Sequence, residues 1–111
     1  LGARDLLLRG AVDVLQMDTA RAGGFTEMLK IAALTQAWNI KFAPHCMEYL
    51  NLHLLSAFSN SLYAERLYIF NDLWDHAFLN LPKIENGYVS VPEGPGLGLE
   101  LNMDFVREAA C

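Results

Sequence analysis

Three short apolar segments alternate with two helical patterns in the first 70 residues of the chain, and only a few residues connect them. The segments lie near residues 12–17, 40–44 and 62–69 and are predicted to be strands. Apolar residues recur every three or four positions from Thr26 to Trp38 and from Met47 to Phe58, which predicts helices. Alternation of this kind with short connections is typical of parallel βαβ units, so the sequence predicts an α/β fold.

Composition and charge narrow the class of protein. Hydrophobic residues make up 53% of the chain and charged residues 19%, which indicates a buried part of something larger. The 8 basic and 13 acidic residues give a net charge of -5, which argues against a nucleic-acid partner. No apolar run matches a signal-peptide core or a membrane span, so we expect no membrane partner. Cys46 and Cys111 follow no disulfide spacing, which favours a cytoplasmic location.

The pattern changes beyond residue 70. Residues 85–88 predict a turn that leads into an extended segment over 89–92. The glycine-rich residues 94–98 cannot form a helix interior or a central strand. They also lack the strand before and the helix after that a phosphate-binding loop needs, so we reject a nucleotide site. We expect an ordered tail that wraps against another part of the protein.

Two polar residues stand at the ends of the first two predicted strands, Asp18 and His45. Such strand ends form the active-site face of parallel α/β folds, and neighbouring strands lie about 4.8 Å apart. An aspartate bonded to one imidazole nitrogen makes the other nitrogen a general base, and Glu65 on the next predicted strand can face the same pocket. The residues alone leave a second interpretation open: Asp18 only caps a turn, and His45 is a structural histidine beside Pro44.

Several motifs follow one another in a specific order: DVLQMD at 13–18, AGGFTE at 22–27, APH at 43–45 and AERL at 64–67, then GYVSVP at 87–92 and PGLGL at 95–99. Together they resemble the C-terminal part of the mandelate racemase group of the enolase superfamily. The resemblance implies that residues 1–80 are the C-terminal segment of a modified (β/α)₈ TIM barrel, strands 6 to 8. Residues 81–111 would be a tail that packs on a capping domain.

The resemblance also implies roles for the candidate residues. His45 matches the group's dyad histidine, which moves the proton on the carbon next to a substrate carboxylate. Asp18 matches the dyad aspartate that orients this histidine, and Glu65 matches the glutamate that hydrogen-bonds the carboxylate as it becomes an enediolate. The group's full-length enzymes use Mg²⁺ held by carboxylates of the third, fourth and fifth strands. Those strands are not in this chain, so we expect no metal ligand among its residues.

The aspartate at position 18 indicates which branch of the enolase superfamily the sequence resembles. The muconate-lactonising branch has a lysine there, so aspartate favours the acid-sugar dehydratases and mandelate racemase. The stretch from Pro44 to Leu54 is more similar to the acid-sugar dehydratases, which predicts a carbon–oxygen lyase. A racemase or epimerase of a 2-hydroxy acid is one alternative, and a non-catalytic remnant is another.

The expected partners follow from the same resemblance. They are a small carboxylate substrate, either an acid sugar or a 2-hydroxy acid, the rest of the chain's own polypeptide, and further copies in a homo-oligomer. The sequence begins at Leu1 within a helical pattern, so we expect more sequence upstream. The 111-residue chain alone is expected to be inactive.

Overall fold

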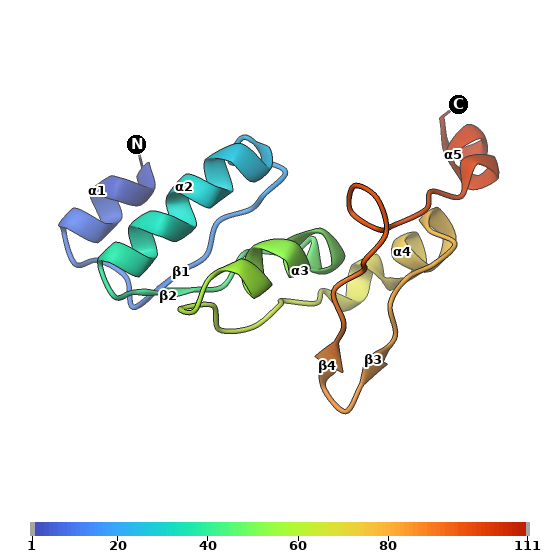
Figure 1. Ribbon diagram of the computed structural model, residues 1–111. Helices are drawn as coiled ribbons and strands as arrows, with labels where there is room; N and C mark the ends of the chain where they lie inside the picture. Colours follow the sequence, from blue (N-terminus) through green and yellow to red (C-terminus); the bar gives the residue numbers. More distant parts are fainter. Residues whose placement is uncertain (1, 111) are drawn as a thin grey trace. The chain divides into compact units, whose positions relative to one another are not determined.

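The computed structural model describes residues 2–110, and the chain divides into two compact units, Leu1–Arg66 and Leu67–Cys111 (Figure 1). The elements of the first unit are, in chain order, α1 (Gly2–Leu8), β1 (Val14–Leu15), α2 (Gly24–Ala37), β2 (Lys41–Phe42) and α3 (Glu48–Ala57). The strands β1 and β2 pair in parallel, with Val14 opposite Lys41 and Leu15 opposite Phe42. The α/β alternation predicted from the sequence is therefore present.

The helix α2 carries the chain from β1 to β2. Gly23 and Gly24, just before and at its first residue, have φ angles of 103° and 77°, in the left-handed region that glycine adopts without strain. This double turn reverses the chain after the Asp18 loop, so that α2 runs back along the strands. The arrangement leaves the loop after β1 beside the loop after β2.

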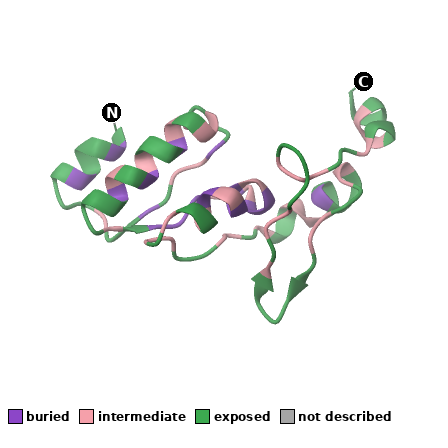
Figure 2. Ribbon diagram, viewed as in Figure 1, coloured by how far each residue is buried: buried purple, intermediate pink, exposed green. Residues whose placement is uncertain are grey.

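The core of the first unit lies between α2, α3 and the strands. Met28 and Ala32 of α2, Phe42 of β2 and Leu54 of α3 are buried against one another (Figure 2). Partly buried apolar side chains pack around this cluster: Met17, Ala22, Phe25, Ile31 and Phe58. Met28, Ala32 and Leu54 thus confirm part of the apolar faces predicted from periodicity, whereas Leu29 of the same α2 pattern is 46% exposed.

The strand predicted over residues 62–69 is not formed, and pairing is limited to one bridge just before it. Phe42 and Ser61 form an isolated parallel bridge, with Phe42 N–H donating to Asn60 O and Leu62 N–H donating to Phe42 O. The next bond of such a ladder would need an N–H from Pro44, and proline has none. Pairing stops there, and residues 68–70 turn into a 3₁₀ helix, η1 (Tyr68–Phe70).

The second unit contains η1, α4 (Asn71–Ala77), a hairpin of β3 (Ile84–Glu85) and β4 (Tyr88–Val89), and α5 (Met103–Ala109). The predicted turn is present: Asn86 and Gly87 both have positive φ, 52° and 81°, as a two-residue hairpin turn of type I′ requires. The helices α4 and α5 were not predicted. The predicted boundary between residues 80 and 81 concerns domains of a longer polypeptide and stays a prediction.

Candidate active site

The parallel pairing of β1 and β2 brings the two predicted dyad residues to one edge. Beyond the strands, His45 N–H donates to Met17 O at 3.0 Å, and Asp18 and His45 form an isolated parallel bridge. The ladder thus reaches both residues, and their side chains lie side by side after the strand ends. Spacing along the sequence predicted this juxtaposition.

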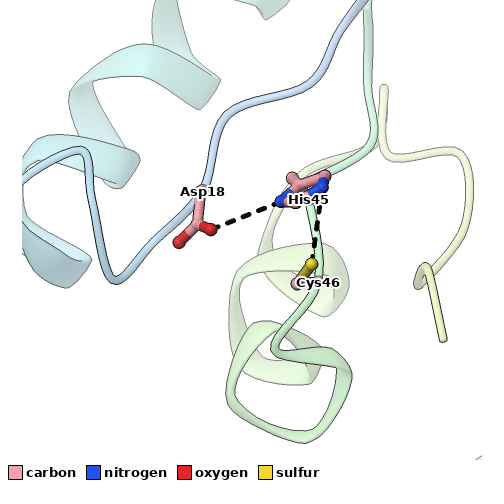
Figure 3. A group of neighbouring side chains, drawn as sticks. All are labelled: Asp18, His45 and Cys46. Atoms are coloured by element: carbon pink, nitrogen blue, oxygen red, sulfur yellow. Dashed lines mark hydrogen bonds and ion pairs between the residues drawn. The ribbon is translucent and has the colours of Figure 1, made fainter. Parts of the chain in front are cut away.

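The imidazole of His45 contacts the carboxylate of Asp18 (Figure 3). His45 Nδ1 lies 3.3 Å from Asp18 Oδ2. The other carboxylate oxygen, Oδ1, accepts hydrogen bonds from the backbone N–H groups of Ala20 at 2.8 Å and Arg21 at 3.2 Å. Burial alone would raise the pKa of Asp18, but the bond to His45, the two N–H donors and the Arg21 charge hold it below its ordinary value of 3.8. Asp18 is therefore a stable anion beside the histidine.

Glu65, the third predicted residue, lies on the other side of the imidazole. Its Oε2 is 3.7 Å from His45 Nε2 and accepts a hydrogen bond from the Cys46 backbone N–H at 2.9 Å. Its Oε1 accepts a hydrogen bond from Gln16 Nε2 at 3.0 Å. Each ring nitrogen of His45 thus faces one carboxylate. Strand pairing stops at Pro44, so no neighbouring strand accepts the hydrogen of the Cys46 N–H. The side chain of Glu65 accepts it instead.

Cys46 belongs to the site, although the sequence did not identify it. Its Sγ lies 3.4 Å from His45 Nε2. Cys46 and Met47 have φ angles of 48° and 46°, and these consecutive left-handed residues turn the chain so that the thiol faces its neighbour's ring. Burial raises the pKa of the Cys46 thiol, and the charges of Glu65 and Asp18 raise it further. The sequence signal that could have identified this residue is a cysteine directly after the candidate histidine.

A buried amide connects the two loops that carry the dyad. Asn51 of α3 is fully buried, and its Oδ1 accepts a short hydrogen bond from the hydroxyl of Thr19, which follows Asp18. Its Nδ2 donates to the backbone carbonyl of Cys46 at 2.7 Å. Asn51 therefore fixes the loop after β1 to the loop after β2. The sequence hint was a polar residue between two leucines of the helix, Leu50 and Leu52.

An open pocket of about 300 Å³ adjoins the dyad. Its lining consists of Gln16, Met17, Asp18, Arg21, Ala22 and His45. The side chain of His45 is 36% exposed, so its ring is accessible to a small molecule. The site combines a histidine held by an aspartate, a second carboxylate and a pocket of small-molecule size, which suits proton transfer.

The donors around His45 do not fit Mg²⁺. That ion prefers a near-octahedral set of oxygens. Here the neighbouring donors include a thiol and an imidazole, which are not the oxygen ligands that Mg²⁺ prefers. A magnesium ion of the whole enzyme would need ligands from elsewhere.

Comparison with known proteins gives one family. Residues 2–105 match the family model described as Enolase C-terminal domain-like. A putative L-rhamnonate dehydratase of Caldivirga maquilingensis is 37% identical, over 95% of this chain and 28% of its own length. An arabinonate dehydratase of Saccharolobus solfataricus is 32% identical, over 96% of this chain and 30% of its own length.

Solved structures agree with these matches. An L-talarate dehydratase from Polaromonas sp. JS666, complexed with Mg and L-glucarate, superposes with a TM-score of 0.82 at 32% identity, over 95% of this chain and 28% of that one. A mandelate racemase/muconate lactonizing enzyme gives a TM-score of 0.89 at 31% identity, over 96% of this chain and 29% of that one. This chain therefore spans less than a third of the length of these relatives.

Proposed function

This chain belongs to the Enolase C-terminal domain-like family, as its motifs predicted, and we propose that it supplies the general base of an acid-sugar dehydratase. Relatives that match nearly its whole length are dehydratases of rhamnonate, arabinonate, xylonate and galactonate. The observation that carries the proposal is the contact of 3.3 Å between His45 Nδ1 and Asp18 Oδ2, beside an open pocket.

The proposed chemistry uses the two sides of the imidazole differently. Asp18 as a carboxylate accepts the hydrogen of Nδ1, which leaves a lone pair on Nε2. Nε2 then removes the proton from the carbon next to the substrate carboxylate. Glu65 faces Nε2 from 3.7 Å. As the carboxylic acid it would donate a hydrogen bond to the substrate carboxylate as that group gains charge.

Dehydration completes the sequence. The electron pair left by the proton forms a carbon–carbon double bond as the hydroxyl on the adjacent carbon departs. The imidazolium of His45 returns its proton to that hydroxyl, which leaves as water. The resulting enol rearranges to a 2-keto acid, so no oxidant or reductant is needed.

Mg²⁺ is proposed as the cofactor of the whole enzyme. The support is the related L-talarate dehydratase, which is complexed with Mg and L-glucarate. The site around His45 does not fit this ion, so the proposal assigns its ligands to other parts of the enzyme.

The test uses the complete reading frame that contains this chain. The enzyme is incubated with Mg²⁺ and a panel of aldonic and aldaric acids in D₂O, and a 2-keto-3-deoxy acid is the expected product. His45→Asn should lower kcat by about 10²–10⁴-fold with little change in KM, because it removes proton transfer rather than substrate binding. His53→Asn, a histidine of α3 away from the dyad, is the control and should keep normal turnover.

The products also discriminate between the alternatives. Exchange of the proton next to the carboxylate with an epimer as product, and no loss of water, would assign a racemase instead. Turnover of His45→Asn equal to that of the His53→Asn control would refute the general base itself.

A further inference from the structure

We propose that His45 Nε2, Cys46 Sγ and Glu65 Oε2 form a binding site for a thiophilic divalent cation of the Zn²⁺ class. The site is separate from the magnesium site of the whole enzyme, and its donors differ from those that Mg²⁺ prefers. Thiolate and imidazole select borderline-soft ions, whereas magnesium favours oxygen.

Two of the three distances between the donors are close to those around a tetrahedral ion. Bonds of about 2.3 Å to sulfur and about 2.0–2.1 Å to nitrogen place these two atoms about 3.6 Å apart at a tetrahedral angle. The observed distance from Cys46 Sγ to His45 Nε2 is 3.4 Å. A nitrogen and an oxygen ligand would lie about 3.4 Å apart, and His45 Nε2 is 3.7 Å from Glu65 Oε2. Glu65 is not in the group of donors whose ligand atoms lie within 4.8 Å of one another, so its carboxylate would have to move toward the Cys46 thiol when the ion binds.

The backbone explains why two consecutive side chains converge. Neighbouring residues of an extended chain point to opposite sides, so His45 and Cys46 would normally diverge. The left-handed φ angle of Cys46 brings the thiol to the imidazole instead. The Cys46 N–H also holds Glu65 Oε2 at 2.9 Å, so the same turn places the third donor.

Asp18 supplies the usual support for a metal-binding histidine. It contacts Nδ1, the nitrogen opposite the proposed ligand atom, at 3.3 Å. A carboxylate on the far nitrogen fixes the tautomer that leaves Nε2 free for the ion. One donor atom from each of Asp18, His45 and Cys46 lies within 4.8 Å of the others, which shows how compact the group is (Figure 3).

Access to the site is through the imidazole. The side chain of His45 is 36% exposed and lines the pocket, whereas Cys46 is buried. The ion would enter from the pocket and keep a water as its fourth ligand. Binding does not depend on the proposed function, but its consequence does: an ion on Nε2 occupies the lone pair of the general base and would block turnover.

The test titrates the complete enzyme that contains this chain, purified free of metal, with Co²⁺, a spectroscopic substitute for Zn²⁺, and then displaces it with Zn²⁺. We expect a near-ultraviolet thiolate-to-cobalt charge-transfer band that excess Mg²⁺ does not remove. Cys46→Ser should abolish the band, and His45→Gln should weaken Co²⁺ binding at least tenfold. Asp18→Asn should weaken it about 10–100-fold, the range for partners that orient a metal ligand. Cys111→Ser is the matched cysteine control and should keep the band.

A band that survives in Cys46→Ser, or one that disappears in Cys111→Ser, would overturn the proposal. A second measurement uses the protein without substitutions, so its result does not depend on whether a variant folds. Zn²⁺ should slow alkylation of Cys46 by iodoacetamide at least tenfold, measured on the peptide by mass spectrometry, while Mg²⁺ should not. Equal alkylation with and without Zn²⁺ would also overturn it, whatever the turnover of the complete enzyme.

Discussion

Replacing Asn51 with leucine tests whether one buried amide joins the two loops that carry Asp18 and His45. Asn51 is fully buried, and its amide bonds Thr19 on one loop and the Cys46 carbonyl on the other. Leucine has the same number of side-chain heavy atoms, branched at the same carbon, but neither donates nor accepts a hydrogen bond. The Asn51→Leu variant therefore leaves the hydroxyl of Thr19 and the carbonyl of Cys46 without this partner.

The size of the effect follows from the two lost bonds. A buried polar group left without its partner costs about 1–3 kcal/mol. Burying extra apolar atoms returns part of this, so the free energy of unfolding should fall by about 2–4 kcal/mol. Such a loss is large against the typical total of about 5–15 kcal/mol.

Urea unfolding followed by circular dichroism measures the change. Ser56→Ala on the same helix removes an exposed hydroxyl and should change stability by no more than about 0.5 kcal/mol. In a double-mutant cycle, Thr19→Val together with Asn51→Leu should cost less than the sum of the two, because no unpaired hydroxyl remains at position 19. A urea midpoint for Asn51→Leu equal to that of Ser56→Ala, or strict additivity in the cycle, would refute the reasoning.

Two further predictions concern acid stability and association. Because its folded-state pKa is lowered, Asp18 should contribute stability that is fully present above pH 3.8 and lost as the pH falls through the folded-state pKa. Asp18→Asn should therefore flatten the acid side of the stability–pH curve, measured by urea unfolding at a series of pH values. Because Tyr68, Ile69 and Tyr88 are 86%, 77% and 79% exposed, the isolated chain should self-associate in sedimentation experiments, and a sharp monomer with a cooperative melt would contradict this.

The sequence predicted the elements whose apolar patterns are strong. The helices α2 and α3 appear within a few residues of their expected ends, because their apolar faces cover the strands. The strand predicted over 62–69 shows the limit of pattern alone. Its apolar content was right for a strand, but a ladder also needs a donor on the partner, and Pro44 does not have one. The missing N–H of Pro44 is a property that the sequence itself shows.

The candidate site divides in the same way. Asp18, His45 and Glu65 were predicted because the ends of parallel strands share one edge, and the structure brings all three together. Cys46 and Asn51 were missed. The position of the Cys46 thiol depends on a left-handed turn at two non-glycine residues, and that of Asn51 on the rotation of α3 about its axis. Neither property follows from the local sequence pattern.

The structure separates two contributions of residue 46. The backbone N–H of Cys46 holds Glu65, and any residue other than proline at this position would offer that donor. The sulfur is not needed for this bond, and its contact is with Nε2, the ring nitrogen that proton transfer would use. Cys46→Ser should therefore keep Glu65 in place while removing the thiophilic donor. If both proposals hold, turnover of the complete Cys46→Ser enzyme should lose its sensitivity to Zn²⁺ and keep its dependence on His45.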